Sequence, residues 1–243
     1  MTAGSGKTVA IVQSNYVPWK GYFDLMRSVD ELILYDEVQY TRRDWRNRNM
    51  LKSPVGPRWL TIPVEVKGRY LQRIDETLTS DPDWPTRHWA TLASWYGRAP
   101  FFEHYRATLQ ELYLQTRERH LSCINRRFLE ALAQLLRIST CVSRSSDYES
   151  HGRKSERLLS ICQAAGAARY VSGPAARAYL QEDCFQAAGV EVVWMTYDGY
   201  PEYPQLYPPF EHRVSVLDLL FNVGEAAPRY IARKARRALG GSS

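Results

Sequence analysis

Short apolar strand patterns alternate with helical patterns along most of this chain, which predicts an α/β protein with helices on both faces of a Rossmann-like, mostly parallel sheet. The strand-like runs at 9–12 and 31–35 are almost wholly apolar, as buried strands are. Strand, helix and strand follow one another at the spacing of right-handed parallel crossovers. Helical patterns alone fill about 81–136, which predicts a helical insertion into the sheet domain.

Strands are recognised by short apolar runs rich in β-branched and aromatic residues. They are expected at 9–12, 31–35, 59–66, 140–143, 170–171 and 190–195. Pro63 lies inside the third run and lacks a backbone donor, so that strand should be an edge strand or carry a bulge.

Helices are recognised by 3.6-residue periodicity and by their start and stop residues. They are expected at 19–29, 81–96, from 100 onward, 120–136, 155–165, 174–188 and 214–222. Pro100 and Pro174 suit a first helical turn, and Gly166, Gly189 and Gly224 suit helix ends.

We interpret residues 1–228 as one α/β domain and residues 229–243 as a basic C-terminal helix or tail. The segment 197–209 is rich in proline and tyrosine and carries no periodicity. Long structureless loops of this kind are often lids or binding elements, so this loop is a candidate part of a site.

The bulk composition is that of a globular protein, with 44% hydrophobic and 24% charged residues among 243. No apolar run is long enough to cross a bilayer, and the first residues lack a secretory signal. The four cysteines are scattered and form no CxxC pair, which argues against zinc and for free thiols. We therefore expect a cytoplasmic protein with no metal site.

The formal net charge of +6 predicts an acidic partner, such as a nucleotide, a phosphosugar, tRNA or a membrane surface. The basic residues gather in two clusters. The first comprises Arg42, Arg43, Arg46, Arg48 and Lys52, and the second comprises Arg229, Arg233, Lys234, Arg236 and Arg237.

Polar side chains follow most of the expected strands. In chain order they are Gln13 and Asn15, then Asp36, Gln39 and Tyr40, then Ser145 and Ser146, then Ser172 and Gly173, and finally Asp198. The carboxyl ends of parallel strands share one edge of a sheet, where ligands bind. The expected helix start at Pro174 would add free N–H groups that favour an anion. This set suits acyl or nucleotidyl transfer.

The first basic cluster alternates with aromatic and amide side chains, namely Tyr40, Trp45, Asn47 and Asn49. Arginine binds phosphate or carboxylate in a bidentate manner, and aromatic rings stack on bases or sugars. The segment directly follows an expected strand end, which favours ligand binding over a plain surface loop.

A proline turn after the first strand leads to Trp19, Lys20, Gly21 and Tyr22. Nucleotidylyltransferases of the HxGH type have His-x-Gly-His at this place. The glycine remains here and both histidines are absent, which argues against nucleotidyl transfer by that route. The helix start and Lys20 remain candidates for binding an anion.

The strings QSNYVPWKGYFD, DEVQY, RRDWRNRN, SGPAARAYL, YPEYPQ and SVLDLLFN occur in this order along the chain. With RAPFFEHY and INRRFLEALAQLLRI, they resemble the WbqC-like family over nearly the whole sequence. Ser14 departs from it, since the family commonly has proline there. The resemblance implies a role in O-antigen, surface-polysaccharide or natural-product biosynthesis, with glycine transfer to an amino sugar as a suggested activity.

The leading hypothesis is an aminoacyl (glycyl) or acyl transferase that acts on an amine or hydroxyl of a sugar-containing acceptor. Its catalytic candidates are Asp36, Asp198, Gln13 and Asn15. Its binding candidates are Tyr16, Trp19, Lys20, Gly21, Tyr22, Gln39, Tyr40, Arg43, Trp45, Asn47, Arg48, Lys52, Ser172, Gly173, Tyr203 and Gln205. Either aspartate is a candidate general base, and the amides would orient the acyl group.

No resident cofactor is expected. The donor would be an aminoacyl-tRNA, an acyl adenylate or a CoA thioester, and direct transfer is favoured because no Cys–His or Ser–His pairing is evident. Two alternatives stay open. One is a nucleotidyltransferase with a modified HxGH site, and the other is a non-catalytic module that binds tRNA or a nucleotide sugar. The sequence leaves the oligomeric state undetermined.

Overall fold

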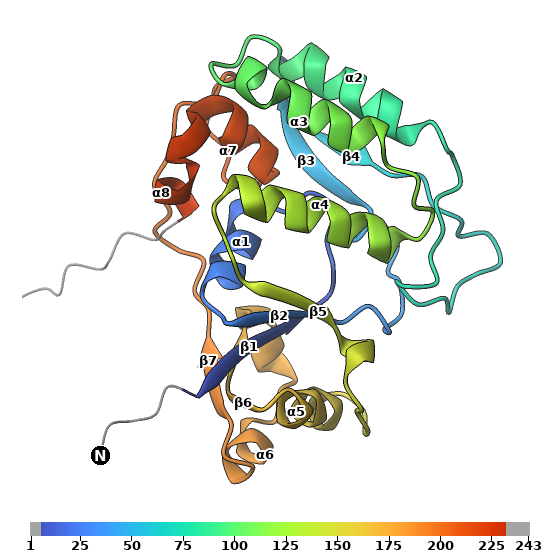
Figure 1. Cartoon of the computed structure of the whole chain (residues 1–243), viewed down its shortest axis with the longest axis vertical. Coiled ribbons are helices and arrows are strands. Elements are labelled where there is room, and N and C mark those ends of the chain that lie inside the picture. The colour runs from blue at the N-terminus through green and yellow to red at the C-terminus, as the bar shows by residue number, and fades with distance from the viewer. Residues whose placement is uncertain (1–5, 232–243) are drawn as a thin grey trace, which may run out of the picture.

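A computed structural model describes residues 6–231 and contains a five-stranded parallel sheet in the order β5-β2-β1-β6-β7 (Figure 1). Its strands are β1 (Lys7–Val12), β2 (Glu31–Leu34), β5 (Cys141–Arg144), β6 (Ala167–Ser172) and β7 (Glu191–Trp194). Numbered along the sheet's own chain order, this is 3-2-1-4-5, the Rossmann order. The prediction of a Rossmann-like α/β fold is confirmed, and the strand order reverses between β1 and β6.

Helices lie on both faces of this sheet (Figure 1). The longer ones are α1 (Lys20–Arg27), α2 (Trp84–Tyr96), α3 (Phe102–Leu114), α4 (Leu121–Leu135), α5 (Ser155–Ala164) and α7 (Val216–Val223). The shorter ones are α6 (Glu182–Ala187), α8 (Ala227–Ile231) and the 3-10 helices η1 (Ser145–Asp147), η2 (Pro174–Ala178) and η3 (Gly224–Ala226). Helices α2 and α3 lie farther away from the sheet, beside the hairpin of residues 48–61 (Figure 1).

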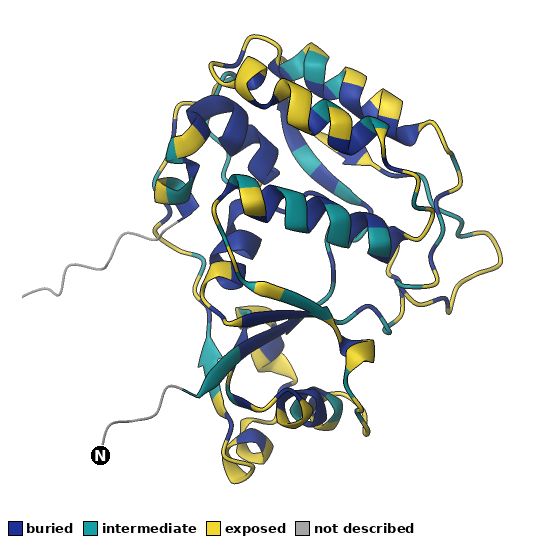
Figure 2. Cartoon of the chain, viewed as in Figure 1, coloured by how far each residue is buried: buried dark blue, intermediate teal, exposed yellow. Residues whose placement is uncertain are grey.

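Alternation along the strands divides the core into two (Figure 2). Ala10 and Leu32 face the larger apolar cluster, which includes residues of α1, α4 and α7. Val9 and Ile33 face the opposite cluster, which α5 and α6 complete. Successive side chains of a strand point to opposite faces, so a sheet covered on both sides needs apolar residues at nearly every position.

The region between β2 and β5 differs in part from expectation. Helices α2, α3 and α4 lie where the helical insertion was predicted. The strand expected at 59–66 is present only in part, because β4 (Gly56–Thr61) ends before Pro63. It pairs antiparallel with β3 (Arg48–Ser53) in a hairpin that is separate from the five-stranded sheet. The basic cluster expected in a loop therefore lies partly on a strand. Met50 opposes Trp59, which pairs their side chains on one face.

The single helix expected at 174–188 is wrong. The segment forms two helices, η2 and α6, and the non-helical residues Tyr179–Gln181 separate them. Ser155 stabilises this break, because its hydroxyl lies 3.4 Å from the Tyr179 carbonyl and accepts from the Gln181 N–H at 3.2 Å. The turn after Ser172 is thus too short to supply a helix terminus that binds an anion.

Helices α7 and α8, red in Figure 1, pack beside α3 and α1 respectively. Within the described residues, no helix has the length and apolar character needed to cross a membrane. Most of the second basic cluster falls in 232–243, outside the described residues, and only its first member, Arg229, lies in α8.

Candidate functional site

The end of β1 is joined to its surroundings by a network centred on Ser14. The Ser14 N–H donates to Asp36 Oδ1 at 2.8 Å, and Asn125 Nδ2 donates to Ser14 Oγ at 2.9 Å. Arg46 donates to the Ser14 carbonyl at 3.3 Å and to Asn15 Oδ1. The structure therefore brings Asn15 and Asp36 together at the carboxyl edge of the sheet, next to the strand-order reversal where Rossmann-like folds bind ligands.

A cavity of about 230 Å³ opens beside this edge, and we call it the tryptophan cavity. It is lined by Asn15, Trp19, Trp45, Asn49 and Arg213. Arg213 is exposed and forms no salt bridge with any described residue. Two indoles, two amides and a guanidinium suit a sugar or nucleoside ring that carries polar or anionic groups.

Aromatic contacts join this cavity to the other side of the strand-order reversal. The rings of Trp19 and Tyr197 have centroids 5.3 Å apart. The Tyr197 hydroxyl lies 3.4 Å from the point where a Cβ on Gly173 would stand. The predicted site residues that follow β1 and β6 are therefore linked through Tyr197, a residue that the sequence reasoning missed.

Gly21 is needed because the Trp19 indole covers it. A Cβ on Gly21 would stand 2.3 Å from Trp19 Cζ2, closer than any real contact. We expect Gly21→Ala to displace the indole from the tryptophan cavity and to lower the free energy of unfolding by about 1–3 kcal/mol. Near-ultraviolet circular dichroism and urea unfolding measure the two effects. Gly173→Ala is the control, since its Cβ would make an ordinary 3.4 Å contact, and an equal effect of both changes would contradict the prediction.

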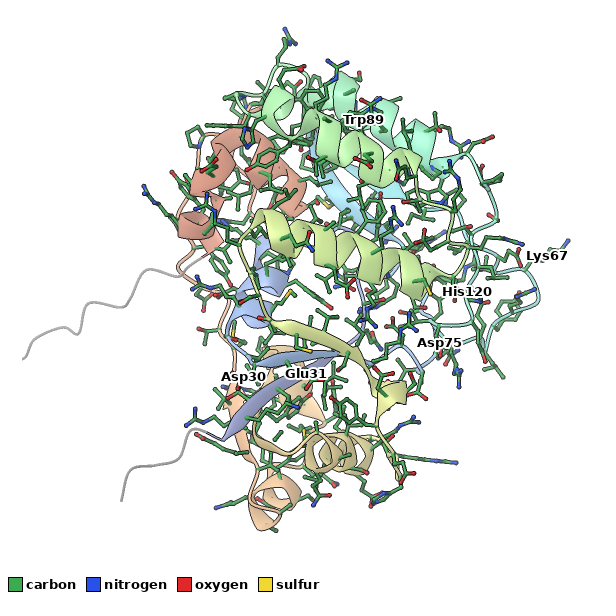
Figure 3. All side chains as sticks on the ribbon, viewed as in Figure 1. Asp30, Glu31, Lys67, Asp75, Trp89 and His120 are labelled. Atoms are coloured by element: carbon green, nitrogen blue, oxygen red, sulfur yellow. The ribbon has the colours of Figure 1, made fainter. Side chains whose placement is uncertain are left out.

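Asp36 lines a second cavity, of about 260 Å³, beyond the ends of β2 and β5. Asp75 and His120, which lie near each other in Figure 3, come from separate loops and line it too. Burial raises the pKa of the Asp36 carboxyl, while the Ser14 N–H and the nearby Arg46 oppose that rise. A buried carboxylate of raised pKa beside a cavity is suited to accept a proton.

Asp198, the other candidate base, lies elsewhere. It is exposed in the loop after β7. It forms no salt bridge with another described residue. The geometry therefore favours Asp36 over Asp198 as the proton acceptor.

Tyr203 and Gln205 bind a carboxylate that the sequence reasoning missed. Asp218 of α7 is fully buried and accepts from the Tyr203 hydroxyl at 2.7 Å, the Tyr96 hydroxyl at 2.8 Å and Gln205 Nε2 at 2.9 Å. An acidic residue inside the apolar run VLDLLF was the signal for it, because a lone charge on a buried helix face requires partners. These contacts anchor the 197–209 loop to α7.

The two predicted phosphate-binding lysines are buried. Lys20 is 2% exposed; its Nζ donates to the Pro201 carbonyl at 3.2 Å and lies 5.2 Å from the Tyr203 ring centre. Burial lowers the pKa of Lys20 to about 8, against the opposing effect of the Asp218 carboxylate. Lys52 is 1% exposed and donates to the Pro209 carbonyl. Both lysines hold the 197–209 loop, which leaves neither directed at a bound phosphate.

Several other binding candidates serve the fold. Tyr16 is fully buried, and its hydroxyl is hydrogen-bonded to Tyr113 and His88, both at 2.9 Å. The Tyr40 hydroxyl donates to Asn47 Oδ1 at 2.9 Å, and Asn47 Nδ2 donates to the Ile62 carbonyl at 2.7 Å. None of these side chains reaches the tryptophan cavity.

The remaining candidates lie around the edge of the site. The Tyr22 hydroxyl donates to the Gln13 carbonyl at 3.2 Å, and burial raises the pKa of Tyr22. Gln39 is exposed and donates to the Tyr70 carbonyl at 2.7 Å, while Ser172 is buried at the end of β6. The exposed Arg43 has a φ of 62°, and its carbonyl accepts from the Arg48 guanidinium.

Comparison with known proteins gives two matches. The model of the WbqC-like protein family matches residues 13–230. The uncharacterised protein Rv1507c of Mycobacterium tuberculosis (strain ATCC 25618 / H37Rv) is 51% identical over 225 residues, which cover 93% of this chain and 97% of that protein. No solved structure matches the chain.

Proposed function

Because the chain belongs to the WbqC-like protein family, we propose that it is an acyltransferase that moves a glycyl, other aminoacyl or acyl group to an amine or hydroxyl of a sugar-containing acceptor. The observation that carries the proposal is the tryptophan cavity beside the end of β1, with the buried Asp36 bound to the same turn. Such an activity places the enzyme in O-antigen, surface-polysaccharide or natural-product biosynthesis.

The tryptophan cavity would receive the acceptor. Its volume of about 230 Å³ suits a single sugar ring, and indole faces pack against the apolar face of such a ring. Asn15 Oδ1 is occupied by Arg46, which leaves Asn15 Nδ2 to donate to the ligand. Asn49 Nδ2 donates to the Tyr16 carbonyl at 3.2 Å, and Asn49 Oδ1 accepts from the Met50 N–H at 2.9 Å. These two bonds hold the Asn49 side of the cavity in a fixed position.

The transfer would proceed without a covalent enzyme intermediate. The acceptor nitrogen or oxygen attacks the carbonyl carbon of the donor and forms the new amide or ester bond. The bond from that carbon to the donor's leaving oxygen or sulfur breaks, and the leaving group takes the electron pair. The proton that the acceptor loses passes to Asp36 by way of water, because Asp36 lines the second cavity and not the tryptophan cavity. The donors around Asn15 stabilise the developing oxyanion.

The test is turnover of a labelled glycyl or acyl donor with amino-sugar and nucleotide-sugar acceptors. We expect Asn15→Ala to raise KM for the acceptor about tenfold, because one hydrogen bond to substrate contributes about 1–1.5 kcal/mol. Gln163→Ala is the matched amide control, since Gln163 is exposed on α5 across the sheet. An unchanged KM in Asn15→Ala would contradict the proposal that the tryptophan cavity binds the acceptor.

A further inference from the structure

The outer face of the β3–β4 hairpin carries side chains that neither core cluster contains. The register places Arg48 opposite Thr61 and Met50 opposite Trp59, so these four share one face. The alternate residues Leu51 and Leu60 are 0% and 5% exposed and pack in the larger core cluster. Leu51 and Leu60 are thus buried on one face of the hairpin, while the opposite face carries Arg48 and Trp59.

Two indoles dominate this outer face. Trp59 is 44% exposed and Trp45 is 37% exposed, and their ring centroids lie 5.2 Å apart. The guanidinium carbon of Arg48 lies 4.1 Å from the centre of the Trp59 ring. Trp45 also lines the tryptophan cavity, so the surface and the cavity are continuous.

The charge around these rings is positive, although the Glu211 carboxylate accepts from the Arg213 backbone N–H at 2.8 Å. Arg42, Arg43 and Arg213 are exposed, and neither they nor Arg48 form a salt bridge within residues 6–231. The acid in the same loop, Asp44, is already engaged. It accepts from the Thr41 hydroxyl and the Trp45 N–H, both at 2.7 Å, and lies 3.6 Å from Arg46.

We propose that this surface, formed by Trp45, Trp59, Arg43, Arg48 and Arg213, binds the nucleotide part of the donor. A base stacks on the exposed indoles, and its phosphates meet guanidinium groups that have no carboxylate partner, the two elements that nucleotide-chain binding sites combine. Among these groups, Arg48 lies over the Trp59 ring and already donates to the Arg43 carbonyl. A neutral apolar partner would leave the three arginines of this surface without counter-charges. That the nucleotide belongs to the acyl donor rests on the proposed function, whereas binding of a nucleotide to this surface does not.

The position of the surface also fits transfer chemistry. A nucleotide held on Trp59 and Trp45 extends toward the tryptophan cavity, because Trp45 forms part of both. The activated carbonyl carbon would then lie near Asn15 and the acceptor. Aminoacyl-tRNA ends, acyl adenylates and CoA thioesters share this nucleotide chemistry, so the experiment must separate them.

The experiment measures binding to the full-length protein by fluorescence anisotropy and tryptophan quenching, without turnover. The probes are a labelled single-stranded RNA ending in CCA, CoA and AMP, each at low and at high salt. We expect at least one probe to bind, with affinity that falls as salt rises. Trp59→Ala and Arg48→Ala should each weaken it about tenfold, since the first removes a stacking ring and the second a guanidinium that meets phosphate.

Two surface variants control for general effects. Tyr179→Ala removes another exposed aromatic, which is 59% exposed after η2. Arg58→Ala removes an exposed arginine that lies opposite Leu51, on the other face of the same hairpin. Neither should change affinity, and far-ultraviolet circular dichroism confirms that every variant folds.

The outcomes separate the sources and the two proposals. If the RNA binds most tightly, the result supports an aminoacyl-tRNA donor. If CoA binds most tightly, it supports a thioester donor, and if AMP binds most tightly, it supports an adenylate donor. The surface proposal is overturned if no probe binds at low salt, or if Trp59→Ala and Arg48→Ala bind as the unaltered protein does. Nucleotide binding that depends on these residues, without transfer of any acyl group, would leave the surface standing and reject the proposed function.

Discussion

Asp36→Asn should lower the rate of acyl transfer by about 100- to 10,000-fold, the range that a general base contributes. The substitution is nearly isosteric, and the amide oxygen can still accept from the Ser14 N–H, which the aspartate binds at 2.8 Å. What is lost is the ability to take the acceptor's proton. Initial rates with a labelled donor measure the effect.

The pH dependence adds a second check on Asp36. Burial raises the pKa of its carboxyl, so the native state holds the proton at higher pH than the unfolded chain does. Activity should therefore fall as the pH drops through that raised pKa. Above the ordinary pKa of an aspartate, the buried ionised carboxylate also lowers the free energy of unfolding. Asp36→Asn should therefore unfold at the same urea concentration as the unaltered protein or at a higher one.

The control for Asp36 is Asp198→Asn. Asp198 is exposed in the loop after β7, and its removal should leave the rate unchanged. Full activity in Asp36→Asn, or equal losses in both variants, would reject Asp36 as the base.

Asp218→Ala should lower the free energy of unfolding by about 3–5 kcal/mol, a large part of a typical total of about 5–15 kcal/mol. The change leaves the buried hydroxyls of Tyr96 and Tyr203 and the amide of Gln205 without their shared acceptor. It also removes the carboxylate that faces Lys20 and Lys52. Urea unfolding with a fixed m-value measures the loss.

Asp218→Asn tests whether hydrogen bonding accounts for that loss. It keeps one acceptor oxygen and should cost less than the alanine variant. Burial raises the pKa of Asp218, so the stability of the unaltered protein should fall as pH rises from the ordinary pKa of an aspartate toward the raised one. The stability of Asp218→Ala should lack that pH dependence. If Asp218→Ala unfolded at the same urea concentration as the unaltered protein, the stabilising role of this carboxylate would be contradicted.

Local patterns located most helices within a few residues. The helix expected at 120–136 is α4, Leu121–Leu135, because apolar residues recur at helical spacing on its buried face. Strand β3 of the hairpin was missed because Arg48–Ser53 contains charged and amide residues that are typical of a loop. Its strand character comes from pairing with β4 and from the core under Leu51, neither of which local sequence encodes.

The same contrast holds in the candidate site. Trp19, Trp45 and Asn15 were predicted binding or catalytic residues, and the structure brings them together around one cavity. Lys20 and Lys52 were predicted to bind phosphate and are instead buried against carbonyls of the 197–209 loop. A sequence shows that a lysine is present, but only the packed loop decides whether solvent or protein surrounds its ammonium group.

The sequence by itself determined the Rossmann-like sheet and the polar residues at its carboxyl edge, because strand and helix periodicity and the order of strand ends are local properties. Only the tertiary structure decided which of these residues face a cavity. Asp36 and Asp198 look equivalent in sequence, yet a 2.8 Å bond from Ser14 and burial at the sheet edge distinguish Asp36. Burial and partner geometry depend on segments far apart in the chain, and those quantities set the chemistry of a carboxylate.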